Sequence, residues 1–184
     1  MERTLESFTA FCYQRLPILS RSEHKKIILD SLKFLVTSER ILLYGFVIMP
    51  NYIKILWSRQ DEWNEKNVQQ IFLKFTAQRM KHFLKTNHRD ELELYRSNRT
   101  DRLYQFWERK NAKKQIQLYA DACAELALIH IAPCDVLKYP SPQNYPYSSA
   151  RFYTTGEDKW KMLVRLSDHA PSSLPVSRSR TRGR

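Results

Sequence analysis

The sequence predicts an α+β domain with a ferredoxin-like, mainly antiparallel sheet that carries helices on one face. A nearly unbroken apolar run at 41–49 is typical of a central strand with both faces covered or paired. After Asn51 the chain alternates residue by residue between two faces, as a strand does. Two longer segments repeat apolar residues at helical spacing. The resulting order, strand–helix–strand–strand–helix–strand, is that of the split βαβ fold.

The first half of the chain supplies three strands and one helix. Residues 7–16 are rich in aromatic and β-branched residues and end before Pro17, which predicts the first strand. Ser20 and Glu23 have the spacing of a capping box, so we expect a helix from there to about residue 36. The turn signal Pro50-Asn51 separates the strand at 41–49 from a third strand at 52–57.

Alternation along the third strand divides its side chains between two faces. Ile53, Ile55 and Trp57 share one face, and Tyr52, Lys54 and Leu56 share the other. We expect this strand to be central and to place Tyr52 and Lys54 away from the first two helices. A free sheet face of this kind often binds single-stranded nucleic acid through aromatic side chains.

The second half is predicted to contain two long helices, a strand and a short helix. Residues 61–64 are polar and begin a helix that runs to about Lys85. The charged segment 88–102 is a connector, and 103–107 is a candidate fourth strand. A helix is expected from Lys110 to about Ile131, ended by Pro133. A short helix lies within 145–153.

The chain divides into three parts by composition. Residues 1–156 are predicted to be the nucleic-acid-binding domain, and 157–170 a C-terminal extension. Residues 171–184 form a Ser- and Arg-rich basic tail that lacks the apolar residues needed to fold alone.

The charge of the chain predicts a polyphosphate partner. Lys and Arg number 31 against 19 Asp and Glu, which gives a net charge of +12. An excess of this size is typical of proteins that bind nucleic acid. For any single cation on the helix at 61–85, an ordinary solvated face is the simpler interpretation. The candidate contacts are Lys66, Lys74, Arg79, Lys81, Arg109, Arg178, Arg180, Arg182 and Arg184, of which the four in the tail are expected to add affinity without specificity.

Several classes of site are excluded or poorly supported. Three glycines rule out a glycine-rich phosphate loop. The three cysteines have no CxxC spacing, and the five histidines form no HxH or HExxH pattern. We therefore expect no metal, no other cofactor and no disulfide. The N-terminus has no signal-peptide core and no apolar run could span a bilayer, so a cytoplasmic location is expected.

Four short blocks, in the same order, resemble REP-associated tyrosine transposases, a family of the HUH single-strand transposases. They are YGFVIMPN at 44–51, FLKFTA at 72–77, YQFWER at 104–109 and YPYSSA at 145–150. The resemblance covers about Phe8 to Gly156 and leaves the tail outside.

The resemblance implies a catalytic site whose residues are replaced here. The family has two metal-binding histidines, separated by one hydrophobic residue, directly after the block that ends at Asn51. These positions hold Tyr52 and Lys54. The family's tyrosine nucleophile corresponds to Leu128. A protonated lysine binds no metal and leucine has no nucleophilic atom, so we expect no catalytic residues, although Tyr119 is a possible substitute nucleophile.

The replacements leave three functions open. The first is a transposase-derived module that binds a DNA hairpin, single-stranded DNA or structured RNA without cleaving it, in which Tyr52 stacks on a base and Lys54 holds a phosphate. The second is an active single-strand transposase or nuclease that uses other residues. The third is an accessory subunit that holds nucleic acid beside a partner enzyme of a mobile element or defence system. The sequence favours the first.

Overall fold

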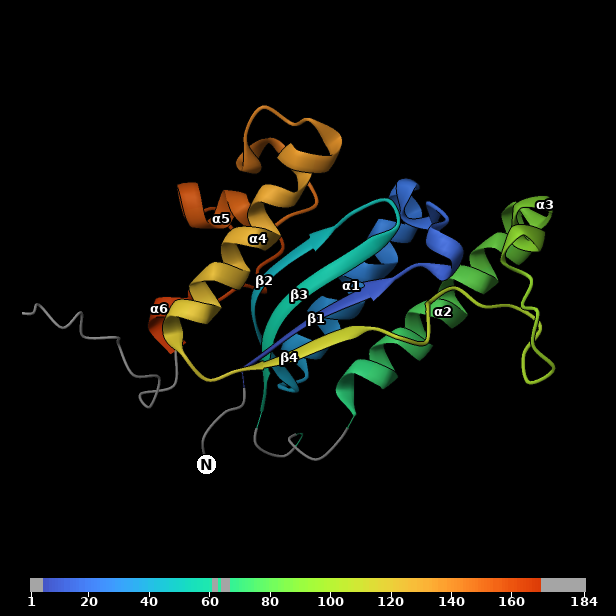
Figure 1. The fold of residues 1–184 in the computed structure, drawn as a ribbon, viewed down its shortest axis with the longest axis horizontal. Helices are drawn as coiled ribbons and strands as arrows, with labels where there is room; N and C mark the ends of the chain where they lie inside the picture. The colour runs from blue at the N-terminus through green and yellow to red at the C-terminus, as the bar shows by residue number, and fades with distance from the viewer. Residues whose placement is uncertain (1–4, 61–62, 64–66, 170–184) are drawn as a thin grey trace, which may run out of the picture.

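The computed structural model describes residues 5–60, 63 and 67–169 and contains one four-stranded sheet flanked by helices (Figure 1). The strands are β1 (Leu5–Phe11), β2 (Ile41–Ile48), β3 (Tyr52–Arg59) and β4 (Ala112–Ile116). The longer helices are α1 (Ser22–Thr37), α2 (Val68–Asn87) and α4 (Tyr119–Leu137), and the shorter ones are α3 (Arg89–Leu92), α5 (Ala150–Thr155) and α6 (Leu166–His169). Single 3-10 turns lie at Tyr13–Arg15, Ile18–Ser20, Glu93–Tyr95 and Pro142–Asn144.

The sheet has the strand order β2-β3-β1-β4, and every neighbouring pair is antiparallel. This is the order of the ferredoxin-like fold, so the predicted fold class is confirmed. β3 lies between β2 and β1, as predicted for a central strand. The prediction that the strand at 41–49 is also central is wrong, because β2 lies at the edge of the sheet and its residues Leu43 and Val47 form isolated bridges with the C-terminal residues Leu163 and Ser148. In the register of β1 and β3, Phe11 lies opposite Tyr52 and Thr9 lies opposite Lys54.

Each face of the sheet has its own apolar core. On one face, Ile53, Ile55 and Trp57 of β3 pack with residues of α1 and α2. On the other face, Leu56 and, less deeply, Tyr52 pack with residues of α4. The predicted alternation along β3 is therefore confirmed.

The prediction that helices cover only one face is wrong. Figure 1 shows α4 lying across the side of the sheet opposite α1. α4 can do this because it turns three apolar residues to the sheet, Ala122, Leu126 and Ile129, all buried. Tyr52 and Lys54 do lie away from α1 and α2, but on a face that α4 partly covers rather than on a free one.

The fourth strand lies at 112–116, not at 103–107. In β4 only Ile116 is buried, and its exposed lysines are typical of an edge strand, which hides it from a search for apolar alternation. The apolar segment 103–107 instead runs as an extended connector. Its Gln105 amide donates to the Tyr95 carbonyl, and Trp107 forms an isolated bridge with Cys12.

The helix predicted at 110–131 begins and ends later. α4 starts at Tyr119 and continues through Pro133 to Leu137, where Lys138 adopts a left-handed conformation. A proline removes one hydrogen bond from a helix, yet α4 continues through Pro133, which is buried. In the described part of the chain, no helix is long and apolar enough to cross a bilayer.

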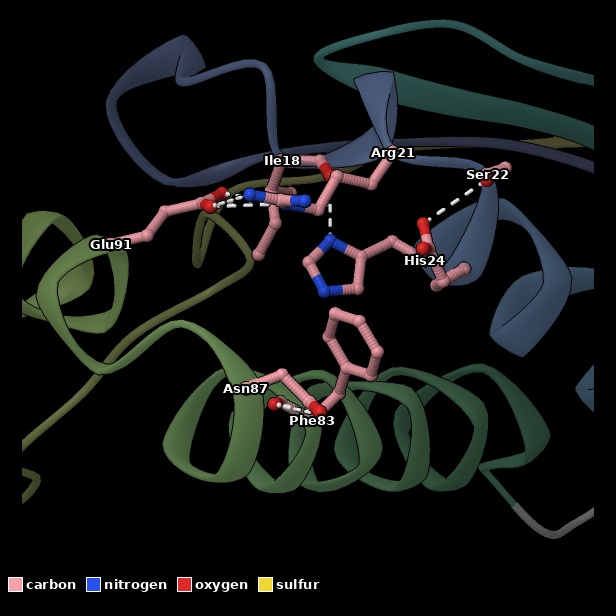
Figure 2. Close-up of polar contacts among 8 residues, drawn as sticks. Ile18, Arg21, Ser22, His24, Phe83, Asn87 and Glu91 are labelled. Atoms are coloured by element: carbon pink, nitrogen blue, oxygen red, sulfur yellow. Dashed lines mark hydrogen bonds and ion pairs between the residues drawn. The ribbon is translucent and has the colours of Figure 1, made fainter.

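Buried His24 joins the start of α1 to α2 (Figure 2). Its Nδ1 lies 2.7 Å from the Ile18 carbonyl oxygen, which can only accept, so Nδ1 carries the proton. Burial lowers the pKa of His24 in spite of this hydrogen bond, which favours the neutral ring. Its ring meets Phe83 of α2 nearly edge-on at 5.2 Å. Above it, Arg21 pairs with Glu91 of α3, so the three helices are held together at this end.

Gly45 lies where Leu126 of α4 packs closely against β2. A Cβ atom built at this position would stand 2.4 Å from Cδ1 of Leu126, well inside van der Waals contact. The register of β2 and β3 also shifts between Leu43 and Gly45. The missing side chain therefore makes room for Leu126 in the core beneath α4.

We predict that the effect of Gly45→Ala on stability changes sign with the residue at position 126. In the wild type, displacement of Leu126 should destabilise the fold by about 1 kcal/mol. In a Leu126→Ala background the contact is gone, and the same change should stabilise by about 0.5 kcal/mol because alanine loses less backbone entropy in a strand. Urea unfolding of the four proteins measures both values. Equal effects in the two backgrounds would contradict the assignment.

Candidate nucleic-acid interface

The position that the resemblance gives to the second metal-binding histidine holds an ion pair. Lys54 Nζ of β3 lies 2.8 Å from Glu125 Oε2 of α4, and both side chains are largely buried. Ser7 Oγ of β1 donates to the same oxygen at 3.2 Å, and Lys114 Nζ of β4 lies 3.7 Å from Oε1. Glu125 thus ties three strands to α4.

This arrangement keeps Glu125 ionised. Burial alone raises the pKa of the carboxyl, but the hydrogen bond and charge of Lys54, with Ser7 and Lys114, outweigh burial and leave the pKa below its ordinary value. The ammonium of Lys54 that the sequence offers to a phosphate therefore already has an internal partner.

The other two positions that the resemblance gives to catalytic residues hold Tyr52 and Leu128. They make no polar contact with each other, since leucine has no polar side-chain atom. Tyr52 is half-buried, and burial, with a smaller effect of Asp135, raises its pKa. Its ring lies 5.9 Å from that of Phe11, the residue opposite it in the sheet. The Leu128 side chain on α4 is 54% exposed. Within the described residues, no group of three or more His, Cys, Asp and Glu side chains gathers at one place.

A groove of about 960 Å³ runs between α2 and the segment 101–113. Its floor is fixed by Trp107, whose indole nitrogen donates to buried Thr76 of α2 at 3.1 Å. Five cations line it against two carboxylates, those of Asp101 and Glu108. The cations are Lys74, Lys81, Arg102, Arg109 and Lys113.

Three of the predicted contacts meet in this groove and one does not. Lys74 and Lys81 approach it from α2 and Arg109 from the opposite wall. Arg79 is exposed on α2 but does not line the groove. Lys66 and the four tail arginines lie outside the described residues.

Two cations of the groove are absent from the sequence-based candidates. Arg102 falls in a segment assigned as a connector, and Lys113 falls in one assigned as a helix. Since β4 is a strand, its alternation sends Lys113 to the α2 side and Lys114 to Glu125 on the α4 side. Assignment of 112–116 as an edge strand would have placed Lys113 on the α2 side of the sheet.

The cations of the groove differ in how far they are already paired. Asp101 pairs with Arg102 at 2.9 Å and with Arg109 at 3.3 Å. Lys113 lies 3.0 Å from buried Glu6. The ammonium of Lys81 stands 5.5 Å from the centre of the Tyr104 ring. The Asp101 pairs are exposed, so a phosphate can compete for Arg102 and Arg109 at little cost, whereas Lys113 is held by a buried carboxylate.

We predict that Lys54→Met and Glu125→Gln each destabilise the fold by about 2 kcal/mol at pH 7, since each leaves a desolvated partner unpaired. The double variant should lose less than the sum. Because the folded pKa of Glu125 lies below its ordinary value of 4.5, the pair stabilises above that pH and its contribution is lost as pH falls through the folded pKa.

The measurement is urea unfolding from pH 7 to pH 3, with Lys26→Met as control. Lys26 forms an exposed pair with Asp30 on α1 and should change stability by at most about 0.5 kcal/mol. Additive losses in the Lys54 and Glu125 cycle would show that the two side chains do not depend on each other.

Comparison with known proteins gives similarity in structure only. No family model and no curated protein matches the sequence. The solved structure of a REP-associated tyrosine transposase bound to a REP hairpin is similar at a TM-score of 0.61, with 12% identity, over 96% of this chain and 95% of that chain. A provisionally assigned transposase from Deinococcus radiodurans gives a TM-score of 0.47, with 13% identity, over 70% of this chain and 90% of that one. The first likeness extends over nearly the whole of both chains, and the protein therefore has the fold of a REP-associated tyrosine transposase.

Proposed function

We propose that this protein binds structured nucleic acid through the groove between α2 and the segment 101–113, and that it does not cleave it. The observation that carries the proposal is the charge of the groove, five cations against two carboxylates, within a chain of net charge +12. Phosphate contacts from such cations supply most of the affinity of nucleic-acid-binding proteins.

A hairpin with an adjoining single strand is the proposed ligand. The similar transposase structure is bound to a REP hairpin, which supports this class of ligand for the fold. The groove is lined on both walls by cations, from α2 and from the segment 101–113, and so suits a phosphate backbone. DNA and structured RNA share this chemistry, and single-stranded nucleic acid is the alternative ligand.

The absence of cleavage is proposed from the groups that replace the family's catalytic residues. Leu128 has no hydroxyl to attack a phosphate. Lys54 is paired with Glu125 and lies where the resemblance places a metal ligand. Tyr119 is a poor substitute, since its hydrogen bond to Cys123 and burial raise its pKa and so disfavour the phenolate.

We predict that Lys74→Ala with Lys81→Ala weakens binding of a DNA hairpin. Loss of two phosphate contacts should reduce the slope of log K against log salt by up to about 2. Titrations at several salt concentrations measure the slope. Arg79→Ala, on the same helix but outside the groove, is the matched control and should change it by less than half as much. If Arg79→Ala had the larger effect, the interface would lie on another side of α2.

We also predict that the protein forms no covalent adduct with a single-stranded hairpin DNA in the presence of Mn²⁺. The reason is the missing hydroxyl at Leu128 and the paired ammonium of Lys54. A denaturing gel tests this. A shifted, protease-sensitive band that disappears in Tyr119→Phe would instead favour an active enzyme that uses a different nucleophile.

A further inference from the structure

A second hollow, of about 620 Å³, continues from the groove. It is lined by Phe11, Arg15, Arg99, Glu108, Arg109 and Lys110. Glu108 and Arg109 line the groove as well, so the two spaces adjoin. Four of its six lining residues are cationic and one is acidic.

The hollow leads from the α2 side of the sheet towards the α4 side. The groove lies beside α2, where Lys113 of β4 points. Phe11 lies opposite Tyr52 in the register of β1 and β3 and its ring lies 5.9 Å from that of Tyr52, on the face that α4 partly covers. A strand leaving the groove past Arg109 therefore arrives at Phe11 and Arg15.

Arg15 lies at stacking distance over the Phe11 ring, with Cζ 3.4 Å from the ring centre. It is exposed, and no ion pair to its guanidinium is found among the described residues. Guanidinium planes of this kind stack on nucleobases as aromatic rings do. The outer side of the guanidinium is therefore a platform already supported from beneath by Phe11.

The backbone that holds Arg15 in place is strained. Gln14 and Arg15 both have positive φ, 51° and 57°, which is uncommon for residues other than glycine. Glu108 stabilises the turn from the neighbouring segment, because its carboxylate accepts from the Gln14 amide at 2.7 Å and its own amide donates to the Phe11 carbonyl at 2.8 Å. Strain that is maintained by neighbouring contacts in this way is characteristic of functional sites.

We propose that the Arg15 guanidinium, stacked on Phe11, binds the first unpaired nucleobase of a hairpin whose stem lies in the groove. Arg99, Arg109 and Lys110 hold the phosphates on either side of that base. The inference rests on the proposed function, and it adds a point of recognition where paired and unpaired nucleotides meet. The stacking ring of Tyr52, which the sequence suggested for this task, lies beyond Phe11 on the same path.

The test uses three DNA hairpins with one stem: a blunt one, and two with a short unpaired extension on the 5′ or the 3′ side. The first unpaired base of each extension is 2-aminopurine, whose fluorescence reports stacking. The variant is Arg15→Lys, which keeps the charge and removes the planar group. The control is Arg79→Lys, an exposed arginine of α2 outside both spaces.

We expect the wild type to bind one of the extended hairpins about tenfold more tightly than the blunt one and to change its 2-aminopurine fluorescence. Arg15→Lys should abolish this preference and the fluorescence change, while blunt-hairpin affinity and its salt slope stay as in the wild type. Arg79→Lys should leave all of them unchanged.

Two results would overturn the inference: equal binding of blunt and extended hairpins by the wild type, or a preference that survives Arg15→Lys. Failure of the proposed function is seen separately, on the blunt hairpin, if the Lys74 and Lys81 variant binds it as well as the wild type does.

Discussion

The packing of α4 against the sheet is the contact on which the arrangement of the site depends. It rests on a small apolar surface of Ala122, Leu126 and Ile129, and it is close because Gly45 has no side chain to meet Leu126. Close packing excludes water from the space between helix and strand. A charged group left there without a partner is costly, so the pairing of Lys54 with Glu125 follows from the position of α4 as much as from the residues themselves.

That pairing gives Lys54 a structural task. A divalent cation held by side chains of a sheet attracts carboxylates and phosphates alike. Here the ammonium of Lys54 pairs with the Glu125 carboxylate of α4, which Ser7 and Lys114 also contact. Its charge is therefore largely balanced within the protein. The proposed interface therefore lies around the edge of the sheet, where Arg102 and Arg109 are paired with an exposed carboxylate and Lys113 contacts buried Glu6.

The sequence predicted those parts of the fold in which burial and periodicity agree. The alternation of β3 and the apolar run of β2 are such cases, and both faces of β3 were assigned correctly. It failed at β4, where an edge strand of alanine, lysine and glutamine has almost no apolar signal, and at 103–107, where an apolar segment packs without joining the sheet. The side of Lys113 depended on that strand, and the position of Arg15 depended on a left-handed turn between non-glycine residues. Residue types alone predict neither, since both depend on contacts between segments that are distant in the sequence, such as the contact of Glu108 with Gln14.

The two long helices on opposite faces of the sheet differ in charge, and this bears on the path of a nucleic acid. α2 carries Lys74, Arg79, Lys81 and Lys85 and no acidic residue. α4 carries Asp121, Glu125 and Asp135 and no lysine or arginine. A phosphate chain is thus attracted to the α2 side. On α4 the charge of Glu125 is balanced by Lys54, so a strand that passes round the sheet end past Arg109 meets repulsion mainly as it nears Asp135. Arg15 lies before that point. The proposed stacking contact there would hold the strand at the edge of the face that α4 covers, short of the positions that the resemblance gives to the catalytic residues.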